Sequence, residues 1–176
     1  MQWSKLKKLV EERFADSVRG RVQLYSTTYR RSSCCCEEGR GWIAVDGIEM
    51  DSFSTQKALG AEYELERVTR AINGVTDFDD PRYAEVSQEA RHTRHKQGLY
   101  TKYEFIRSLE DYLALTINEA LGSRNPIVRG LAMVDRRLGK RKLKQIVLDW
   151  ESHSLVIRLR DFRCQIEGVN KNRKAA

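Results

Sequence analysis

Apolar and polar residues alternate with two different periods along the chain. Apolar residues recur at helical spacing over residues 5–16, and residues 21–30 and 42–50 are rich in the β-branched and aromatic residues of strands. From residue 54 onward helical spacing returns. The pattern predicts an α+β fold, with an N-terminal helix on a small antiparallel sheet and a C-terminal helical bundle after it.

A hairpin is the strongest local signal. Asp46-Gly47 separates two apolar runs, and both residues of a two-residue type I′ turn need positive φ angles, which Asp and Gly tolerate. Such a turn fixes which residues face each other across the two strands. We therefore expect four residues to share one face against the first helix: Ile43, Val45, Ile48 and Met50.

Capping residues mark the ends of the predicted helices. Ser54 or Thr55 opens a helix that ends at Asn73-Gly74, and Asp80-Pro81 opens one that ends at Gly98. The apolar positions of the first are Leu59, Tyr63, Leu65, Val68 and Ile72.

The later helices include the most apolar one. Thr101-x-x-Glu104 is a capping box, and the helix it opens extends to Gly122 as the predicted central core helix. Asn125-Pro126 opens the next. Residues 154–168 contain a short alternating stretch typical of a strand, but apolar spacing over the whole segment favours a helix.

The length of 176 residues predicts a single domain over residues 1–169, with helix and sheet in 1–53 and helices in 54–169. Residues 170–176 are predicted to be a disordered basic tail. The sequence has no apolar run long enough to span a membrane and no secretory signal, so we expect a cytoplasmic protein.

Positive charge is concentrated in the C-terminal part. Residues 1–100 carry equal numbers of acidic and basic side chains, so residues 101–176 account for the whole net charge of +7. Residues 124–144 hold eight Lys or Arg and one acid, Asp135. A helical projection places Arg129, Arg136 and Lys140 on one stripe opposite the apolar side.

A positive stripe of this kind favours contact with a phosphate backbone or an acidic protein surface. A solvated helix face, with Asp135 as a buried partner of one arginine, is the structural alternative. The predicted nucleic-acid-binding residues are Arg129, Arg136, Arg137, Lys140, Arg141 and Lys144.

Metal or redox chemistry has weaker support. His92 and His95 lie three residues apart and supply fewer ligands than a metal site needs, and Cys34, Cys35 and Cys36 lack zinc or Cys-x-x-Cys spacing. Acids near Asp80 could hold magnesium, but helix capping explains them better. No motif predicts a cofactor or assigns a catalytic residue, so the sequence favours a binding protein over an enzyme.

Several short motifs together resemble a family of small uncharacterised bacterial proteins. They are Trp3-Ser-Lys5 with Lys7-Lys8, Gly20-Arg-Val22, Thr28-Tyr-Arg30, Gly39-Arg40, Val45-Asp-Gly47, and the stretch from Val134 to Arg141. The resemblance covers nearly the whole chain and implies no activity. Three functions stay open: a nucleic-acid or polyanion binding protein, a protein-interaction subunit of a larger bacterial assembly, and a metal-dependent hydrolase.

Overall fold

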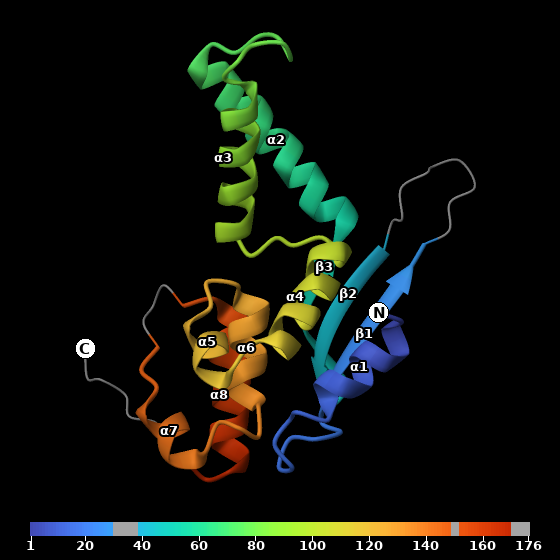
Figure 1. Cartoon of the computed structure of the whole chain (residues 1–176), viewed down its shortest axis with the longest axis vertical. Helices are drawn as coiled ribbons and strands as arrows, with labels where there is room; N and C mark the ends of the chain where they lie inside the picture. The colour runs from blue at the N-terminus through green and yellow to red at the C-terminus, as the bar shows by residue number, and fades with distance from the viewer. Residues whose placement is uncertain (30–38, 149–151, 170–176) are drawn as a thin grey trace. The chain divides into compact units, whose positions relative to one another are not determined.

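The computed structural model describes residues 1–29, 39–148 and 152–169. Figure 1 shows helices and a small sheet in the order α1, β1, β2, β3, then α2 to α8. The first elements are α1 (Trp3–Glu11), β1 (Val22–Thr28), β2 (Gly39–Val45) and β3 (Ile48–Ser54). The remaining helices are α2 (Thr55–Asn73), α3 (Tyr83–Lys96), α4 (Lys102–Ala114), α5 (Ile117–Gly122), α6 (Pro126–Val134), α7 (Lys140–Gln145) and α8 (Ser154–Ile166). The predicted α+β class is confirmed.

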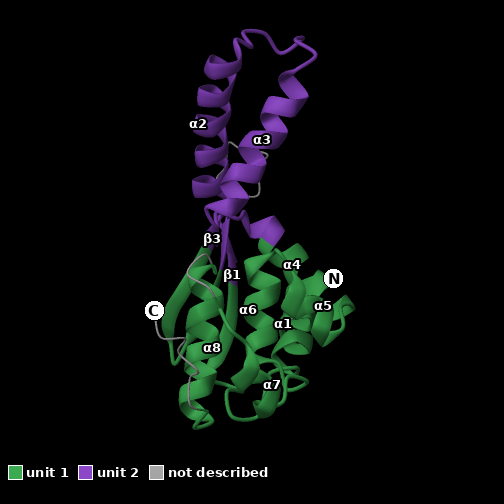
Figure 2. Ribbon diagram, turned by 90° about the vertical axis from the view of Figure 1, so that its left-hand side faces the viewer, with its two compact units in different colours: residues 1–25, 42–52, 105–176 green, residues 26–41, 53–104 purple. Residues whose placement is uncertain are grey.

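The chain divides into two compact units, coloured separately in Figure 2. Unit 1 comprises residues 1–25, 42–52 and 105–176, and unit 2 comprises residues 26–41 and 53–104. The cysteine triplet at residues 34–36 and the predicted tail at residues 170–176 lie outside the described residues.

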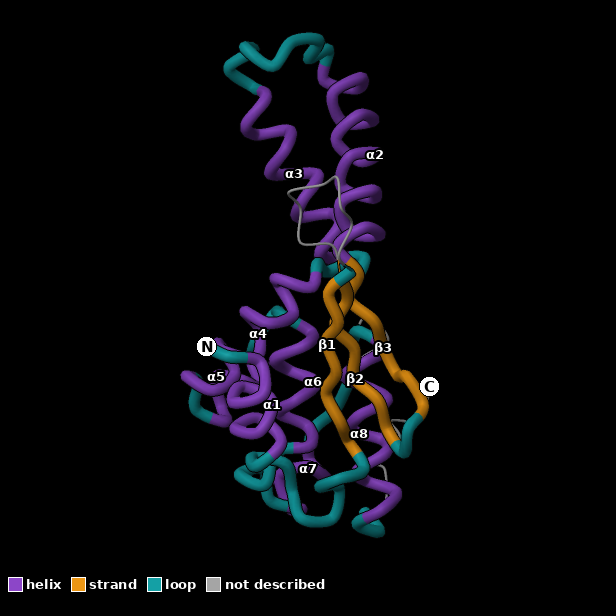
Figure 3. Tube along the Cα trace, turned by 90° about the vertical axis from the view of Figure 1, so that its right-hand side faces the viewer, coloured by secondary structure: helices purple, strands orange, loops and turns teal. Residues whose placement is uncertain are grey.

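The sheet has the order β1-β2-β3, with β2 in the middle (Figure 3). Asp46 and Gly47 have φ angles of 51° and 79°, so the predicted hairpin turn is confirmed. Ile43 and Val45 are buried, but Ile48 is 70% exposed. The expectation that Ile48 packs with them was therefore wrong.

β1 is an edge strand, and helix α1 protects part of its open side. Leu6 and Val10 of α1 are buried, which fixes one face of the helix in the core of unit 1. Glu11 Oε1, one turn further along, accepts a hydrogen bond of 2.8 Å from the backbone N–H of Leu24. This amide would otherwise be an unpaired donor of the sheet edge.

Helix α2 follows its capping signals closely. The Ser54 hydroxyl accepts from the Lys57 amide, and Gly74 ends the helix with a φ of 64°. The predicted capping box of Thr101 and Glu104 is also formed, with hydrogen bonds of 2.7 and 3.1 Å. The helix at residues 154–168 is likewise confirmed as α8.

Two helix predictions were wrong. The helix predicted to run to Gly122 ends at Ala114, because Thr116 and Glu119 form a second capping box that opens α5. The helix predicted to start at Asp80-Pro81 starts at Tyr83, although the Asp80 carboxylate accepts a hydrogen bond from the Arg82 amide as a capping residue does.

Helix α6 is the most buried helix described. All of its residues except Arg129 are buried, and it packs against α8. A Cβ on Gly130 would lie 3.2 Å from a Leu159 methyl carbon and 3.3 Å from the Leu155 Cγ, so the glycine allows the close approach of α8. This packing positions the basic segment that follows α6.

Candidate functional site

The basic segment does not form one helix. Helix α6 ends at Val134, and Asp135 has extended backbone angles and forms an isolated bridge with Phe14. The amide of Arg136 donates to the Arg13 carbonyl at 2.8 Å. The predicted stripe of Arg129, Arg136 and Lys140 on one helix face was therefore wrong, because the chain turns away between them.

Asp135 determines the shape of this turn. Its carboxylate is fully buried and accepts hydrogen bonds from the Tyr112 hydroxyl at 2.6 Å and from the Arg137 amide at 2.7 Å. The Arg137 guanidinium completes an ion pair of 2.7 Å. Burial, and then the charge of Asp135, raise the pKa of Tyr112 above its usual range, so Tyr112 remains a donor. Arg137 therefore has a structural partner, as the alternative explanation of the basic segment expected.

Arg163 of α8 holds the same turn from the other side. Its guanidinium is 3% exposed and donates to the carbonyls of Met133, Asp135 and Leu138 over 2.6–3.1 Å. Glu167 pairs with it at 3.0 Å. Sequence reasoning missed this role, since an arginine at a buried helix position carries no signal of the backbone carbonyls it will meet.

Helix α7 presents the remaining cations. Leu143 is its buried anchor and packs with Leu138 and Cys164. Six cationic side chains of the turn and the helix are exposed. Arg137 binds Asp135 and Lys142 binds Asn118, whereas the other four have no ion pair or side-chain hydrogen bond within the described residues. We call them the α7 cationic surface: Arg136, Lys140, Arg141 and Lys144.

Several other basic residues of unit 1 form ion pairs, unlike those of the α7 cationic surface. Arg21 binds Asp46 at 2.6 Å, Arg158 binds Asp51 at 3.6 Å, and Lys7 and Lys8 each bind a glutamate one turn away. Within the described residues, no member of the α7 cationic surface forms an ion pair. The pKa of Glu167 lies below its usual value. Burial raises this pKa, but hydrogen bonds from Ser17 and Arg163 and the nearby charge of Lys140 together lower it by more.

Several like charges on so short a helix are unfavourable. Lys140 and Lys144 are four positions apart and therefore lie on the same side of α7. Like charges at this spacing destabilise a helix. Lys142 and Lys144 in the last turn gain only the modest attraction of the helix dipole. A bound polyanion would relieve this repulsion, which is what the arrangement can do chemically.

Arg129 and Lys142 lie apart from this surface in a cleft of about 410 Å³ between α5, α6 and α7. Arg129 is half-buried, and Lys142 donates to the side-chain oxygen of Asn118. The structure thus places Arg129 differently from the other predicted nucleic-acid contacts.

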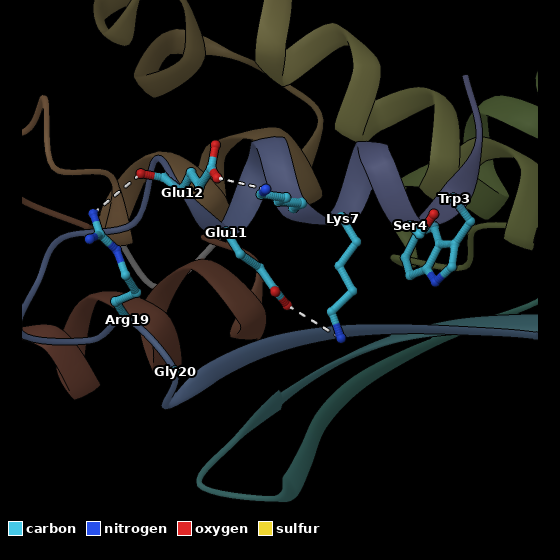
Figure 4. A pocket seen from close by; sticks show the side chains of 8 residues that line it. Trp3, Ser4, Lys7, Glu11, Glu12, Arg19 and Gly20 are labelled. Carbon is cyan, nitrogen blue, oxygen red and sulfur yellow. Dashed lines mark hydrogen bonds and ion pairs between the residues drawn. The ribbon is translucent and has the colours of Figure 1, made fainter.

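A second hollow, of about 470 Å³, lies along α1 (Figure 4). Trp3 is at one end and Arg19 and Gly20 are at the other. Each of its three cations has an acidic partner, because Lys7 pairs with Glu11, Lys8 with Glu12 and Arg19 with Asp16. These pairings distinguish the groove from the α7 cationic surface.

The metal hypothesis gains no support from the described residues. His95 Nε2 lies 2.8 Å from Glu104, and its ring stacks on Tyr100 at 4.8 Å between centroids, whereas His92 is exposed. Within residues 1–29, 39–148 and 152–169, no three His, Cys, Asp or Glu side chains are grouped to hold a metal. None of the helices in these ranges is long and apolar enough to cross a membrane.

The sequence model of one protein family, the SF0329 protein family, matches residues 2–164. The chain belongs to this family. The match is consistent with the resemblance to an uncharacterised family and covers every element from α1 to most of α8. Searches of curated proteins and of solved structures each gave no match. The function must therefore be argued from the site itself.

Proposed function

We propose that this SF0329 family member is a non-enzymatic binding protein that contacts nucleic acid or another polyanion through the α7 cationic surface. The observation that carries the proposal is the grouping of Arg136, Lys140, Arg141 and Lys144 without ion pairs within the described residues. Arg137 is not included because it binds Asp135, and Arg129 is not included because it lines the separate cleft.

The surface supports affinity rather than sequence preference. Lysine and arginine bind phosphates mainly through charge, which releases counterions and makes the binding sensitive to salt. Base-specific recognition needs side chains that reach base edges, and exposed cations alone do not supply it. We therefore expect binding to mixed-sequence nucleic acid that weakens as salt rises.

Fluorescence anisotropy with labelled mixed-sequence DNA and RNA, single- and double-stranded, tests the proposal on purified, nuclease-treated protein. The variant Lys140→Glu/Lys144→Glu is expected to bind at least about tenfold more weakly at moderate salt. The slope of log affinity against log salt concentration should also become less negative by about two, because two phosphate contacts are lost.

A matched control keeps the change in net charge the same. Lys57 and Arg67 are exposed residues of α2, so Lys57→Glu/Arg67→Glu removes as much positive charge from another surface. The control is expected to bind almost as the wild type does. No binding of the wild type at low salt, or equal losses in the two variants, would contradict a local polyanion surface.

A protein-interaction function is the second candidate, and a specific observation favours it. Leu59, Tyr63, Val68 and Ile72 of α2 are 47–79% exposed. They form two pairs four positions apart, with Leu59 and Tyr63 on one side of the helix and Val68 and Ile72 on the opposite side. Exposed apolar side chains grouped on one helix are typical of surfaces that contact another protein.

A further inference from the structure

The cleft between α5, α6 and α7 has the size of a small-molecule site. Its volume of about 410 Å³ falls within the usual range of ligand pockets. Each of the three helices contributes to its wall, and all three belong to unit 1. The lining residues are Asn118, Leu121, Arg129, Met133, Lys142 and Ile146.

One part of the lining is cationic and incompletely satisfied. The Nε of Arg129 is buried and has no hydrogen-bond partner within the described residues. Lys142 donates to the Asn118 side-chain oxygen, which is a neutral acceptor. Among the described residues that line the cleft, Arg129 and Lys142 carry positive charge and none is a carboxylate. A buried donor without a partner is uncommon in a folded protein, and an anion bound in the cleft would supply an acceptor.

The other part of the lining is apolar and rigidly supported. Met133 is 1% exposed and belongs to the buried helix α6. Leu121 and Ile146 are partly buried and pack against a small core. That core consists of Leu138, Leu143 and Cys164. Apolar walls with a few polar groups at one side are the usual composition of a ligand pocket.

We propose that this cleft binds a small amphiphilic anion. Arg129 and Lys142 contact its anionic group, a phosphate or a carboxylate, and Leu121, Met133 and Ile146 contact its apolar part. Arg129 supplies planar, directional donors suited to such an anion, and Lys142 supplies a second point charge. The site goes beyond the polyanion function and does not depend on it.

The dye 8-anilinonaphthalene-1-sulfonate, an anion on an apolar aromatic body, is a direct probe. The full chain is expected to bind it at one saturable site, measured by the rise in dye fluorescence. Arg129→Met keeps an unbranched apolar stem but removes the guanidinium and its charge, and should weaken binding at least tenfold. Arg124→Met changes an exposed arginine just before α6 and should bind as the wild type does.

Circular dichroism shows whether Arg129→Met is folded. If it is not, Lys142→Met provides a second test, because Lys142 is exposed and its replacement should leave the fold intact. Unchanged dye affinity in Lys142→Met and in a folded Arg129→Met would overturn the proposal. Competition then identifies the ligand class: displacement by octanoate indicates an aliphatic carboxylate, and displacement by adenosine 5′-monophosphate indicates a nucleotide. Displacement by neither would also overturn it.

The same variants separate this proposal from the polyanion function. Arg129→Met is expected to retain nucleic-acid binding in the anisotropy assay, because the α7 cationic surface is unchanged. Lys140→Glu/Lys144→Glu is expected to retain dye binding, because neither residue lines the cleft. Loss of both activities in either folded variant would contradict two separate sites.

Discussion

Asp135 is the single acid of the basic segment, and its carboxylate organises the backbone around it. It receives the Tyr112 hydroxyl and the amide and guanidinium of Arg137 while fully buried. A buried carboxylate of this kind is stable only while its donors remain in place. The residue therefore serves folding, and the exposed cations beside it are available for binding.

Asp135→Ala is expected to lower the free energy of unfolding by about 3 kcal/mol, because it leaves buried donors without an acceptor. Urea unfolding followed by circular dichroism measures this change. Nucleic-acid affinity per folded molecule should stay the same. A variant that is as stable as the wild type but has lost binding would place Asp135 in the binding surface instead.

At the scale of elements, unit 2 is held by a buried ionic cluster. Arg94 of α3 is 1% exposed and pairs at 2.7 Å with both Glu62 of α2 and Glu104 of α4. Burial raises the pKa of Glu104, but hydrogen bonds from Arg94, Thr101 and His95 outweigh this effect and bring it to about 2. The cluster thus links three helices through charged groups that depend on one another.

The lowered pKa of Glu104 gives unit 2 an acid-sensitive contribution to stability. A depressed pKa stabilises the fold fully above the unfolded value of 4.5, and this stabilisation is lost as pH falls towards 2. Glu104→Gln should therefore lower the melting temperature at pH 7 and reduce its change between pH 4.5 and 2. Circular dichroism melts across this range measure both effects.

Glu64→Gln is the control for this pH dependence, because Glu64 is an exposed carboxylate of α2. It should leave the melting curves close to those of the wild type. An unchanged acid dependence in Glu104→Gln would show that other carboxylates govern the loss of stability.

Turn and capping patterns in the sequence correctly predicted those elements whose structure depends on neighbouring residues. The Asp46-Gly47 turn and the limits of α2 follow from backbone and capping preferences that involve only neighbouring residues. The break before α5 was also present in the sequence, as Thr116-x-x-Glu119, but the continuous apolar spacing concealed it. Capping signals therefore deserve the same weight inside an apolar pattern as at its ends.

The candidate site was only partly predictable. The excess of positive charge over residues 124–144 was evident, but its arrangement depended on tertiary contacts. A helical projection assumes an unbroken helix, and the bonds of Asp135 and Arg163 end α6 before the projected stripe begins. The cleft beside Arg129 could not be predicted, since its walls come from three helices brought together by packing.

At the scale of the whole molecule, charge and exposed apolar area belong to different units. The α7 cationic surface is in unit 1, whereas Leu59, Tyr63, Val68 and Ile72 are in unit 2. Contact with a polyanion and contact with a protein therefore require different residues. The two candidate functions can be separated by substitution.

Tyr63→Ser/Ile72→Ser tests the protein-interaction candidate. The two side chains are 68% and 79% exposed, so we expect their replacement to leave the melting temperature within a few degrees of the wild type. Capture of a partner protein from lysate should fall with this variant and persist with Lys140→Glu/Lys144→Glu. Equal capture by the α2 variant and the wild type would exclude α2 as the contact surface.

The hydrogen bond from the Leu24 amide to Glu11 has a consequence for self-assembly. An open sheet edge offers backbone donors to any extended chain, which is how strands of neighbouring molecules join into fibrils. On β1 this donor is already occupied by a side chain from α1. A strand that added at Leu24 would first have to displace Glu11, so the first helix also protects the protein against amyloid growth at this position.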